Sequence, residues 1–326
     1  MKNTPYLSFV VVGRNDDYGG RFLERFQRCL SNIIFLCDKH KLSAELVIVE
    51  WNPPGDKKRL RGVMDIPSSD FLEVRFIEVP KKIHDKVGVG LGGSLCHEYL
   101  GKNVGIRRAR GEFVLATNSD IIFSDRMIEF LSQKKLRKDT VYRTNRYDLF
   151  KEVPENLNGD NLLKFCEQNW GKEQSIVFGH SIRGLRKIYY LPRMIARALL
   201  PYLKKKWRLY KHHAGAPGDF TLMSKDAWVK IRAYPEIGIF VLLDVYAVQM
   251  AVAQFGKFCR IPKKIYHQYH TCPLVRGKAC LRDQSINMEK YKKDSMKMLK
   301  ERKAIRYNSD DWGMKGVKLK ETLIQK

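Results

Sequence analysis

An asparagine, a serine and an aspartate follow an apolar run in the first half of the sequence, and they are the first residues that could do chemistry. In the stretch KNVGIRRARGEFVLATNSDI, residues 102–121, the apolar residues 113–116 predict a buried strand that ends on Asn118, Ser119 and Asp120. Packing gives no reason for such a strand to end on three polar residues. They either form an ordinary turn or deliver a carboxylate to a ligand.

The elements that must position this triplet alternate between strand and helix through residues 1–135. Apolar runs and helical spacing predict strands at 7–13, 45–51, 72–79 and 112–117, and helices at 21–41 and 99–110. This alternation favours an α/β fold with a mostly parallel sheet and right-handed crossovers. In such sheets ligands bind beyond the carboxyl ends of the strands, which is where the polar clusters of this half are found.

The second half of the chain has a different pattern. GDFTLMSKDAW, residues 218–228, predicts a strand entering a helix with Ser224 as its N-cap. Further predicted elements are a helix at 240–255, a last strand at 264–270 and a helix within 286–303. We therefore expect four parts: an α/β half at 1–150, a basic insertion at 151–213, a second half of the same domain at 214–280 and a Lys-rich helical tail at 281–326.

The chain is strongly basic, with 61 Lys and Arg against 35 Asp and Glu and a formal net charge of +26. Such an excess favours polyanionic partners, namely nucleic acid, an anionic membrane face or phosphorylated small molecules. Residues 182–213 interleave Leu, Ile, Tyr and Trp with Arg, Lys and His. This composition is typical of an interfacial amphipathic helix, which would make an anionic membrane surface a partner, but it also suits a charged surface around a small subcore.

The cysteines and the N-terminal residues indicate the cellular compartment. Seven scattered cysteines form no CxxC pair, so they give no support to a zinc ribbon or a dithiol redox motif and favour free thiols in a reducing compartment. The first apolar run is short and is followed by charged residues, which predicts a strand and not a signal peptide. No apolar stretch approaches the ~20 residues that cross a bilayer. We expect a cytoplasmic protein that can lie on a membrane face.

The stretch 102–121 resembles the segment of GT-A nucleotide-sugar glycosyltransferases that leads into their DXD-type motif. In that family a helical asparagine, an Ala-Arg-Gly turn and an apolar strand deliver one or two carboxylates to a divalent cation on the sugar diphosphate. GDFTLMSKDAW and the aspartate of LLDVYAVQMAVAQFG are similar to acceptor-side segments of the same superfamily. The resemblance implies a Rossmann-like GT-A fold, with a central sheet flanked by helices. It also implies transfer of a sugar from a UDP- or GDP-sugar, bound by 1–150, to a glycan or lipid-linked acceptor beside 214–280.

The resemblance further implies that Asp120 binds Mn²⁺ or Mg²⁺, although Asn118 stands where the first aspartate of the DXD pattern would be. An amide oxygen is a poorer ligand than a carboxylate, but both cations accept oxygen ligands and keep several waters. His267 and His270 lie at a predicted strand end and could place an imidazole near the diphosphate, as in several GT-A enzymes. The alternative is a pair of ordinary surface or core histidines. A cation on Asp120 would stabilise the charge that develops on the leaving diphosphate.

The same resemblance places the polar residues that follow the first two strands at the nucleoside: Arg14, Asn15, Asp16, Asp17 and Glu50. Their carboxylates can accept hydrogen bonds from ribose hydroxyls and a base N–H, or they can serve as helix N-caps. Asn103 and Arg107 lie one helical turn apart and, with Asn118 and Ser119, could reach the donor. A solvated basic helix face is the alternative.

An inverting transfer needs a base that deprotonates the acceptor hydroxyl. Asp244 has apolar neighbours on both sides, which favour the protonated carboxyl unless it is paired and suit a proton acceptor. Asp219 ends the small-residue run AGAPGD, which allows close approach of the backbone to a ligand. We take Asp244 as the first candidate and Asp219 as the second. For each, the alternative is a buried aspartate satisfied by an arginine.

Two other functions suit parts of the sequence. The net charge would suit a nucleic-acid-binding protein, but no RRM, KH or helix-turn-helix signature is present, and acidic strand ends would repel phosphate unless a cation intervened, so we do not expect nucleic acid as a partner. Asn118 would suit an inactive relative that binds nucleotide sugars without turnover. The glycosyltransferase hypothesis makes one spatial prediction, that Asp17, Glu50 and Asp120 gather around a shared pocket for a diphosphate.

Overall fold

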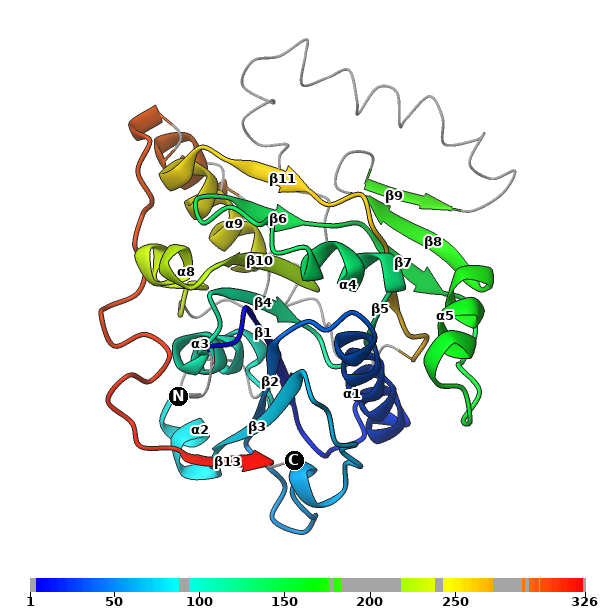
Figure 1. Cartoon of the computed structure of the whole chain (residues 1–326). Helices are drawn as coiled ribbons and strands as arrows, with labels where there is room; N and C mark the ends of the chain where they lie inside the picture. Colours follow the sequence, from blue (N-terminus) through cyan, green and yellow to red (C-terminus); the bar gives the residue numbers. More distant parts are fainter. Residues whose placement is uncertain are drawn as a thin grey trace.

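The strands of this protein form two sheets (Figure 1). The computed structural model describes residues 4–87, 94–175, 179–182, 218–237, 243–271, 289–290, 293–298 and 300–324. The larger sheet has eight strands in the order β11-β6-β10-β4-β1-β2-β3-β13, and the smaller has five in the order β5-β12-β7-β8-β9. The two sheets meet where β4 ends and β5 begins.

The larger sheet is mostly parallel. Its centre consists of four parallel strands: β3 (Leu72–Val79), β2 (Ala44–Trp51), β1 (Leu7–Gly13) and β4 (Phe113–Thr117). β10 (Phe220–Ser224) runs antiparallel between β4 and β6 (Val141–Arg143), and β11 (Phe258–Arg260) is parallel to β6. β13 (Lys320–Ile324) pairs antiparallel with β3 at the other edge.

The smaller sheet begins directly after Asp120. It consists of β5 (Ile121–Phe123), β12 (Ile265–His267), β7 (Arg146–Leu149), β8 (Trp170–Ser175) and β9 (Gly179–Ile182). β12 is antiparallel to β5 and parallel to β7, and the β7–β8 and β8–β9 pairs are antiparallel. Since only residues 118–120 separate β4 from β5, the polar triplet is the passage from one sheet to the other.

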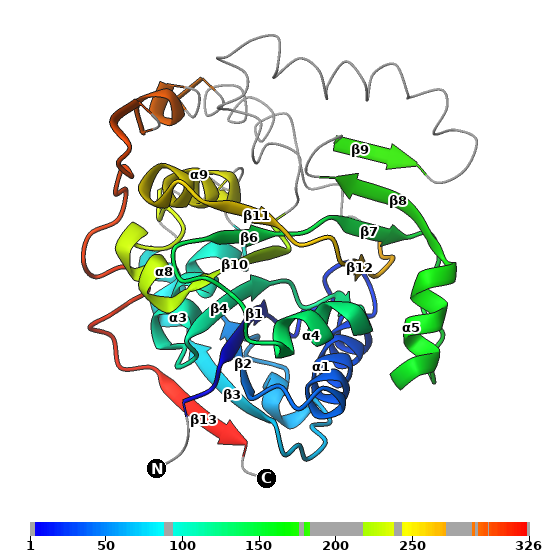
Figure 2. The same cartoon turned by 45° about the horizontal axis from the view of Figure 1, so that its top comes forward.

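Helices cover both faces of the larger sheet because its strands alternate their side chains between two apolar cores. Phe9 and Val11 of β1 belong to the core beneath α1 (Phe22–Lys39) and α4 (Asp125–Ser132). Val10 and Val12 belong to the core beneath α3 (Glu98–Arg108), α8 (Lys225–Ile231) and α9 (Leu243–Phe255). In the turned view of Figure 2, α1 and α4 lie on one side of β1 and α3 and α8 on the other. The predicted α/β fold with a helix-flanked, mostly parallel sheet is confirmed.

Shorter helical segments complete the described chain. α5 (Gly159–Gln168) packs on the smaller sheet through Leu162 and Cys166. The 3₁₀ turn η1 (Leu60–Gly62) follows β2, and α2 (Lys81–Val87) follows β3. Ser224 caps α8 as predicted, since its hydroxyl accepts a hydrogen bond from the Ala227 amide at 3.1 Å.

Two glycines bring α3 close to β1. A Cβ on Gly101 would lie 2.8 Å from the methyl groups of Val12, and a Cβ on Gly105 would lie 2.4 Å from Cγ1 of Val10. Because Gly101 faces the later residue of β1, α3 runs opposite to the strand. The N-terminus of α3 therefore lies at the carboxyl end of β1, where the predicted site is.

Valine in place of Gly105 should destabilise the fold, because the added side chain overlaps Val10 in a packed core. We expect a loss of about 1–3 kcal/mol in the free energy of unfolding, measured by urea denaturation. Gly55→Val is the control, because a Cβ there meets nothing within 4 Å. Equal stability of the two variants would show that α3 does not need this close approach.

Several segments differ between the sequence prediction and the structure. The smaller sheet was not predicted, and 264–270 is not the last strand, because β12 is followed by β13. Of the predicted Lys-rich tail, residues 293–298 are helical, but its end is the edge strand β13. The part of the basic insertion at 183–213, proposed for a membrane surface, lies outside the described residues.

Two general expectations can be compared with the described part of the chain. Among its helices, none is both long and apolar enough to cross a bilayer. The described cysteines are free thiols: Cys29, Cys37, Cys96, Cys166 and Cys259. The other two, Cys272 and Cys280, lie outside the described residues.

Candidate functional site

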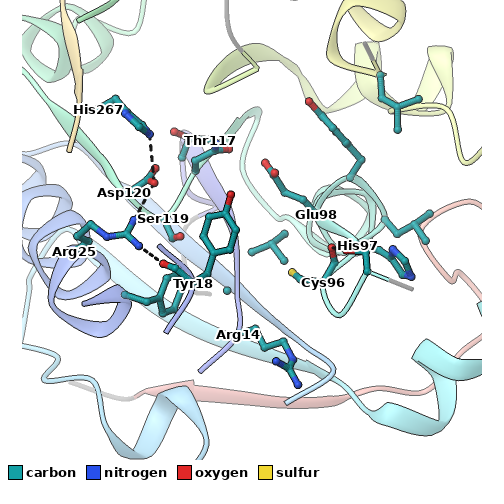
Figure 3. A pocket seen from close by; sticks show the side chains of 18 of the residues that line it. Arg14, Tyr18, Arg25, Cys96, His97, Glu98, Thr117, Ser119, Asp120 and His267 are labelled. Atoms are coloured by element: carbon teal, nitrogen blue, oxygen red, sulfur yellow. Dashed lines mark hydrogen bonds and ion pairs between the residues drawn. The ribbon is translucent and has the colours of Figure 1, made fainter. Parts of the chain in front are cut away.

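A cleft of about 1260 Å³ lies at the carboxyl ends of β1 and β4 and is lined by residues of both sheets. Its walls come from the end of β1, the triplet after β4, the start of α3, one face of β7 and β8, and residues 267–270 after β12. Figure 3 shows Thr117 and Asp120 on one side of the cleft and Glu98 on the other. The cleft is therefore located where the ligand of an α/β sheet is expected.

Asp120 lies among three basic side chains of the cleft. Its Oδ2 lies 3.2 Å from Nη1 of Arg25, 3.5 Å from Nε2 of His267 and 3.4 Å from Nε2 of His270. Its Oδ1 is buried and has no hydrogen-bond partner among the described residues. A buried carboxylate oxygen without a partner is costly unless a ligand binds it, so this atom indicates a place for a cation or a donor group.

The three predicted metal ligands lie together. One ligand atom each from Asp120, His267 and His270 can be chosen so that all lie within 4.8 Å of one another. One carboxylate and two imidazoles fit Mn²⁺ better than Mg²⁺, because Mg²⁺ strongly prefers oxygen ligands. The residues present therefore fit the implied cation.

Electrostatics favour the ionised form of the Asp120 carboxylate. Burial alone would raise the pKa of Asp120, but the neighbouring His267 and His270 bring that pKa well below its usual range. Burial alone would lower the pKa of His267, but the charge of Asp120 raises it. Asp120 is therefore an anion at neutral pH, which is the form that binds a cation, whereas His267 must lose its proton before it can bind one.

Asn118 lines the cleft, but its amide group is used inside the protein. Its Oδ1 accepts a hydrogen bond from Nζ of Lys102 at 2.6 Å, and its Nδ2 donates one to Oδ1 of Asp219 at 2.6 Å. Lys102 is only 1% exposed and also contacts Glu98 at 2.5 Å. An aspartate at position 118 would face Asp219 directly, so this local contact favours the amide over the carboxylate of the DXD pattern.

The loop after β1 contributes part of the predicted nucleotide site. Arg14, Asp16 and, from the triplet, Ser119 line the cleft. Arg14 and Asp16 form an ion pair of 2.7 Å, and Nε of Arg14 donates to the Asn52 carbonyl at 2.7 Å. Asn15 does not line the cleft, because its amide donates to the Lys58 carbonyl at 2.9 Å.

The expectation that Asp17, Glu50 and Asp120 share a pocket fails for the first two. Asp17 accepts a hydrogen bond from the Phe22 amide at 3.0 Å, which is a role at the start of a helix, the alternative that the sequence left open. Glu50 is buried, burial raises its pKa, and it accepts from the Leu60 amide at 2.9 Å. In both cases the carboxylate accepts a hydrogen bond from a nearby backbone N–H and does not line the cleft.

Asn103 and Arg107 also do not line the cleft. The amide of Asn103 donates to the Tyr234 carbonyl at 2.8 Å and accepts from the Tyr234 amide at 3.0 Å. The guanidinium of Arg107 lies 3.7 Å from the centre of the Trp312 ring and donates to the Trp312 carbonyl. Both side chains attach later segments of the chain to α3.

The two candidate bases lie behind the cleft wall in different surroundings. Asp219 is held at both oxygens, by Asn118 and by Nη1 of Arg146 at 2.6 Å. Asp244 lies 3.4 Å from Nη2 of Arg143 and directly follows the cleft-lining Leu243. Neither aspartate itself lines the cleft. Each aspartate thus has an arginine partner, as expected if it is a buried structural aspartate and not a base.

Sequence reasoning missed several residues that line the cleft: Tyr18, Arg25, Arg146, Asp148 and Lys172. Arg146 contacts Asp148 at 2.7 Å as well as Asp219, so it joins the smaller sheet to the residue directly before β10. Nδ1 of His267 lies 3.7 Å from Asp148. An arginine within an ordinary helix pattern and short polar strands carry no local signal that would have identified these residues.

No protein-family model matches the chain, and no curated protein matches it. Among solved structures, the chain is similar to residues 1–349 of S. aureus TarS, at 14% identity over 91% of this chain and 71% of that one, with a TM-score of 0.45. It is also similar to the same fragment in complex with UDP-GlcNAc, at 12% identity over 90% and 70%, with a TM-score of 0.49. A longer TarS structure is matched over 43% of its length, at 13% identity and a TM-score of 0.42. At such identities the similarity concerns the fold and not the residues of the cleft.

Proposed function

We propose that this protein is a glycosyltransferase that moves a sugar from a UDP- or GDP-sugar to a glycan or lipid-linked acceptor, with a divalent cation held by Asp120, His267 and His270. The proposal depends most on one observation: Oδ1 of Asp120 has no partner among the described residues and lies beside two imidazoles in a cleft at the carboxyl ends of β1 and β4. When bound, the cation would neutralise the charge that develops on the leaving nucleoside diphosphate.

The cleft has room for a donor of this class and offers suitable groups around it. A volume of about 1260 Å³ exceeds the usual range of small-ligand pockets, so a donor and part of an acceptor could bind together. Arg14 and Asp16, which closely follow β1, can donate hydrogen bonds to the nucleotide part of the substrate and accept hydrogen bonds from it. Lys172 and Arg146, on the smaller sheet, can contact anionic oxygens.

The proposed base is Asp244. Both oxygens of Asp219 accept strong, charge-assisted hydrogen bonds, which leaves it poorly placed to accept a further proton. The contact of Asp244 with Arg143 is longer, at 3.4 Å, and therefore weaker. A lipid-linked acceptor would agree with the basic composition of residues 182–213.

Donor binding can be measured directly through its effect on the melting temperature. UDP-GlcNAc, UDP-glucose and GDP-mannose should be tested with and without Mn²⁺, followed by assay of released nucleoside diphosphate. A ligand at roughly 100-fold its Kd stabilises the native state by about 2.7 kcal/mol, so one donor should raise the melting temperature clearly, and more with Mn²⁺.

The other outcomes distinguish the alternatives. Stabilisation without release of diphosphate, in the presence of candidate acceptors, would indicate an inactive nucleotide-sugar-binding relative. No stabilisation by any donor, together with RNA or DNA binding that weakens steeply with salt, would replace the proposal with a nucleic-acid-binding function.

A further inference from the structure

Arg25 connects the loop after β1 to the proposed cation carboxylate. It lies in the first turn of α1 and is only 4% exposed. Its Nη1 donates to Oδ2 of Asp120 at 3.2 Å and its Nη2 donates to the Tyr18 carbonyl (Figure 3). Its Nε donates to the Gly20 carbonyl at 3.2 Å. One planar guanidinium thus holds two points of the loop and one carboxylate at the same time.

A second set of contacts joins the same loop to the histidine side of the cluster. Oγ1 of Thr271 donates to the Gly19 carbonyl at 3.0 Å. Gly19 has a φ of 72°, and a Cβ on it would lie 2.6 Å from Nδ1 of His270. Only glycine suits this position, because the conformation is left-handed and the imidazole leaves no room for a side chain. The loop is therefore packed against His270.

The backbone carbonyl of Arg25 is hydrogen-bonded to Gln268, in the segment after β12. Nε2 of Gln268 donates to the Arg25 carbonyl at 2.8 Å and to the Asp120 carbonyl at 3.3 Å. The Gln268 amide also donates to the Asp120 carbonyl at 3.2 Å. The loop, Asp120 and the segment after β12 therefore form a closed ring of contacts in which Arg25 has a central place.

The contacts of Asp120 distinguish its two carboxylate oxygens. Arg25, His267 and His270 all approach Oδ2, whereas Oδ1 has no partner among the described residues. A guanidinium on Oδ2 restricts rotation of the carboxylate and leaves the buried Oδ1 as the oxygen that needs a further partner. The loop that contains Arg14, Asp16 and Tyr18 lines the other part of the cleft.

We propose that Arg25 is a positioning residue that couples the conformation of the loop at 14–21 to cation binding at Asp120. This inference rests on the proposed function, because it assigns a role within the same site. A cation held by Asp120 would fix the carboxylate, the fixed carboxylate would hold the guanidinium, and the guanidinium would order the loop through the Tyr18 and Gly20 carbonyls. The nucleotide part of the site is then formed before the donor arrives.

The test uses Mn²⁺ alone, without any donor. Amide hydrogen exchange of residues 14–21 is measured by mass spectrometry with and without Mn²⁺, while Mn²⁺ binding is followed by electron paramagnetic resonance. In the wild-type protein Mn²⁺ should slow exchange in this loop by at least about fivefold, the lower limit of typical coupling between sites. In Arg25→Lys, which keeps the charge but cannot reach three acceptors, Mn²⁺ should still bind and the loop should exchange equally fast with and without it.

The matched control is Arg75→Lys. Arg75 is also buried and also donates to a carboxylate, Glu45, at 3.1 Å, but it does not line the cleft. This variant should keep the wild-type protection of the loop. A merely structural role for Arg25 would lower the melting temperature without changing the effect of Mn²⁺.

The possible results separate this inference from the proposed function. If the wild-type protein binds no Mn²⁺, the cation site and this inference both fail. If the wild-type protein binds Mn²⁺ but the loop is not protected, or if Arg25→Lys is protected as strongly as the wild type, only this inference fails. Should Arg25→Lys not fold, as judged by circular dichroism, the same comparison with Arg25→Gln, which removes the buried charge, decides.

Discussion

Asparagine in place of Asp120 should lower Mn²⁺-dependent donor turnover by about 10³-fold, since stabilisation of the leaving diphosphate by a cation is worth several kcal/mol. Asp120 is the only carboxylate in the proposed cation cluster among the described residues. The amide has nearly the same shape but no charge, so the two imidazoles alone would have to hold the cation. Mn²⁺ binding should weaken in parallel.

The measurement combines initial rates of nucleoside diphosphate release with Mn²⁺ titration followed by electron paramagnetic resonance. Asp139→Asn is the control, because Asp139 is an exposed partner of Lys257 and does not line the cleft. It should keep the wild-type rate and Mn²⁺ affinity. Full activity of Asp120→Asn with Mn²⁺ would show that the cation, if used, is bound elsewhere.

The parts of the fold that could be predicted are those with strong local patterns. β1 and β3 were predicted with their observed ends, and β2 and β4 differ by one residue, because each is a run of buried residues bounded by polar or turn residues. In contrast, β13 is KETLI, an edge strand of exposed and half-buried residues. No apolar run marks such a strand, and its pairing with β3 depends on a contact across most of the chain.

The smaller sheet was not predicted for a different reason. β7 presents Arg146 and Asp148 to the cleft on one face, while Tyr147 packs with Trp170 on the other. Alternation of this kind normally indicates a strand with a solvated face. Here the polar face lines a cleft instead, and the strand of four residues is too short for periodicity to identify it.

The site was predicted in part, from the polar residues that come directly after buried strands. Asp120 faces the cleft because the chain must turn there from one sheet into the other, and this turn leaves its side chain between them. Asp17 follows a buried strand and Glu50 lies at the end of another. Their carboxylates accept hydrogen bonds from the backbone amides of Phe22 and Leu60 instead of facing the cleft. Sequence shows which residues are polar, but not which backbone groups compete for them.

Asp244 and Asp219 should respond in opposite ways to replacement by asparagine, and this contrast identifies the base. Asp244→Asn should lower kcat for donor turnover by about 10²–10⁴-fold, the usual contribution of a general base, with the donor Kd unchanged. Asp219→Asn should instead lower stability by about 3 kcal/mol, because it breaks a buried ion pair with Arg146 at 2.6 Å and disturbs the bond to Asn118.

Both variants are compared by kcat, by donor Kd from calorimetry and by urea denaturation. Asp219→Asn also disturbs Asn118, next to the proposed cation site, so its activity loss should appear in KM and in Mn²⁺ affinity more than in kcat. If Asp219→Asn loses kcat with unchanged stability while Asp244→Asn stays active, the roles are reversed. In that case Arg146 would have to move away from Asp219 when the acceptor binds. Asn118 and Arg146 each donate a hydrogen bond to one oxygen of Asp219, and one of these oxygens would have to accept the proton.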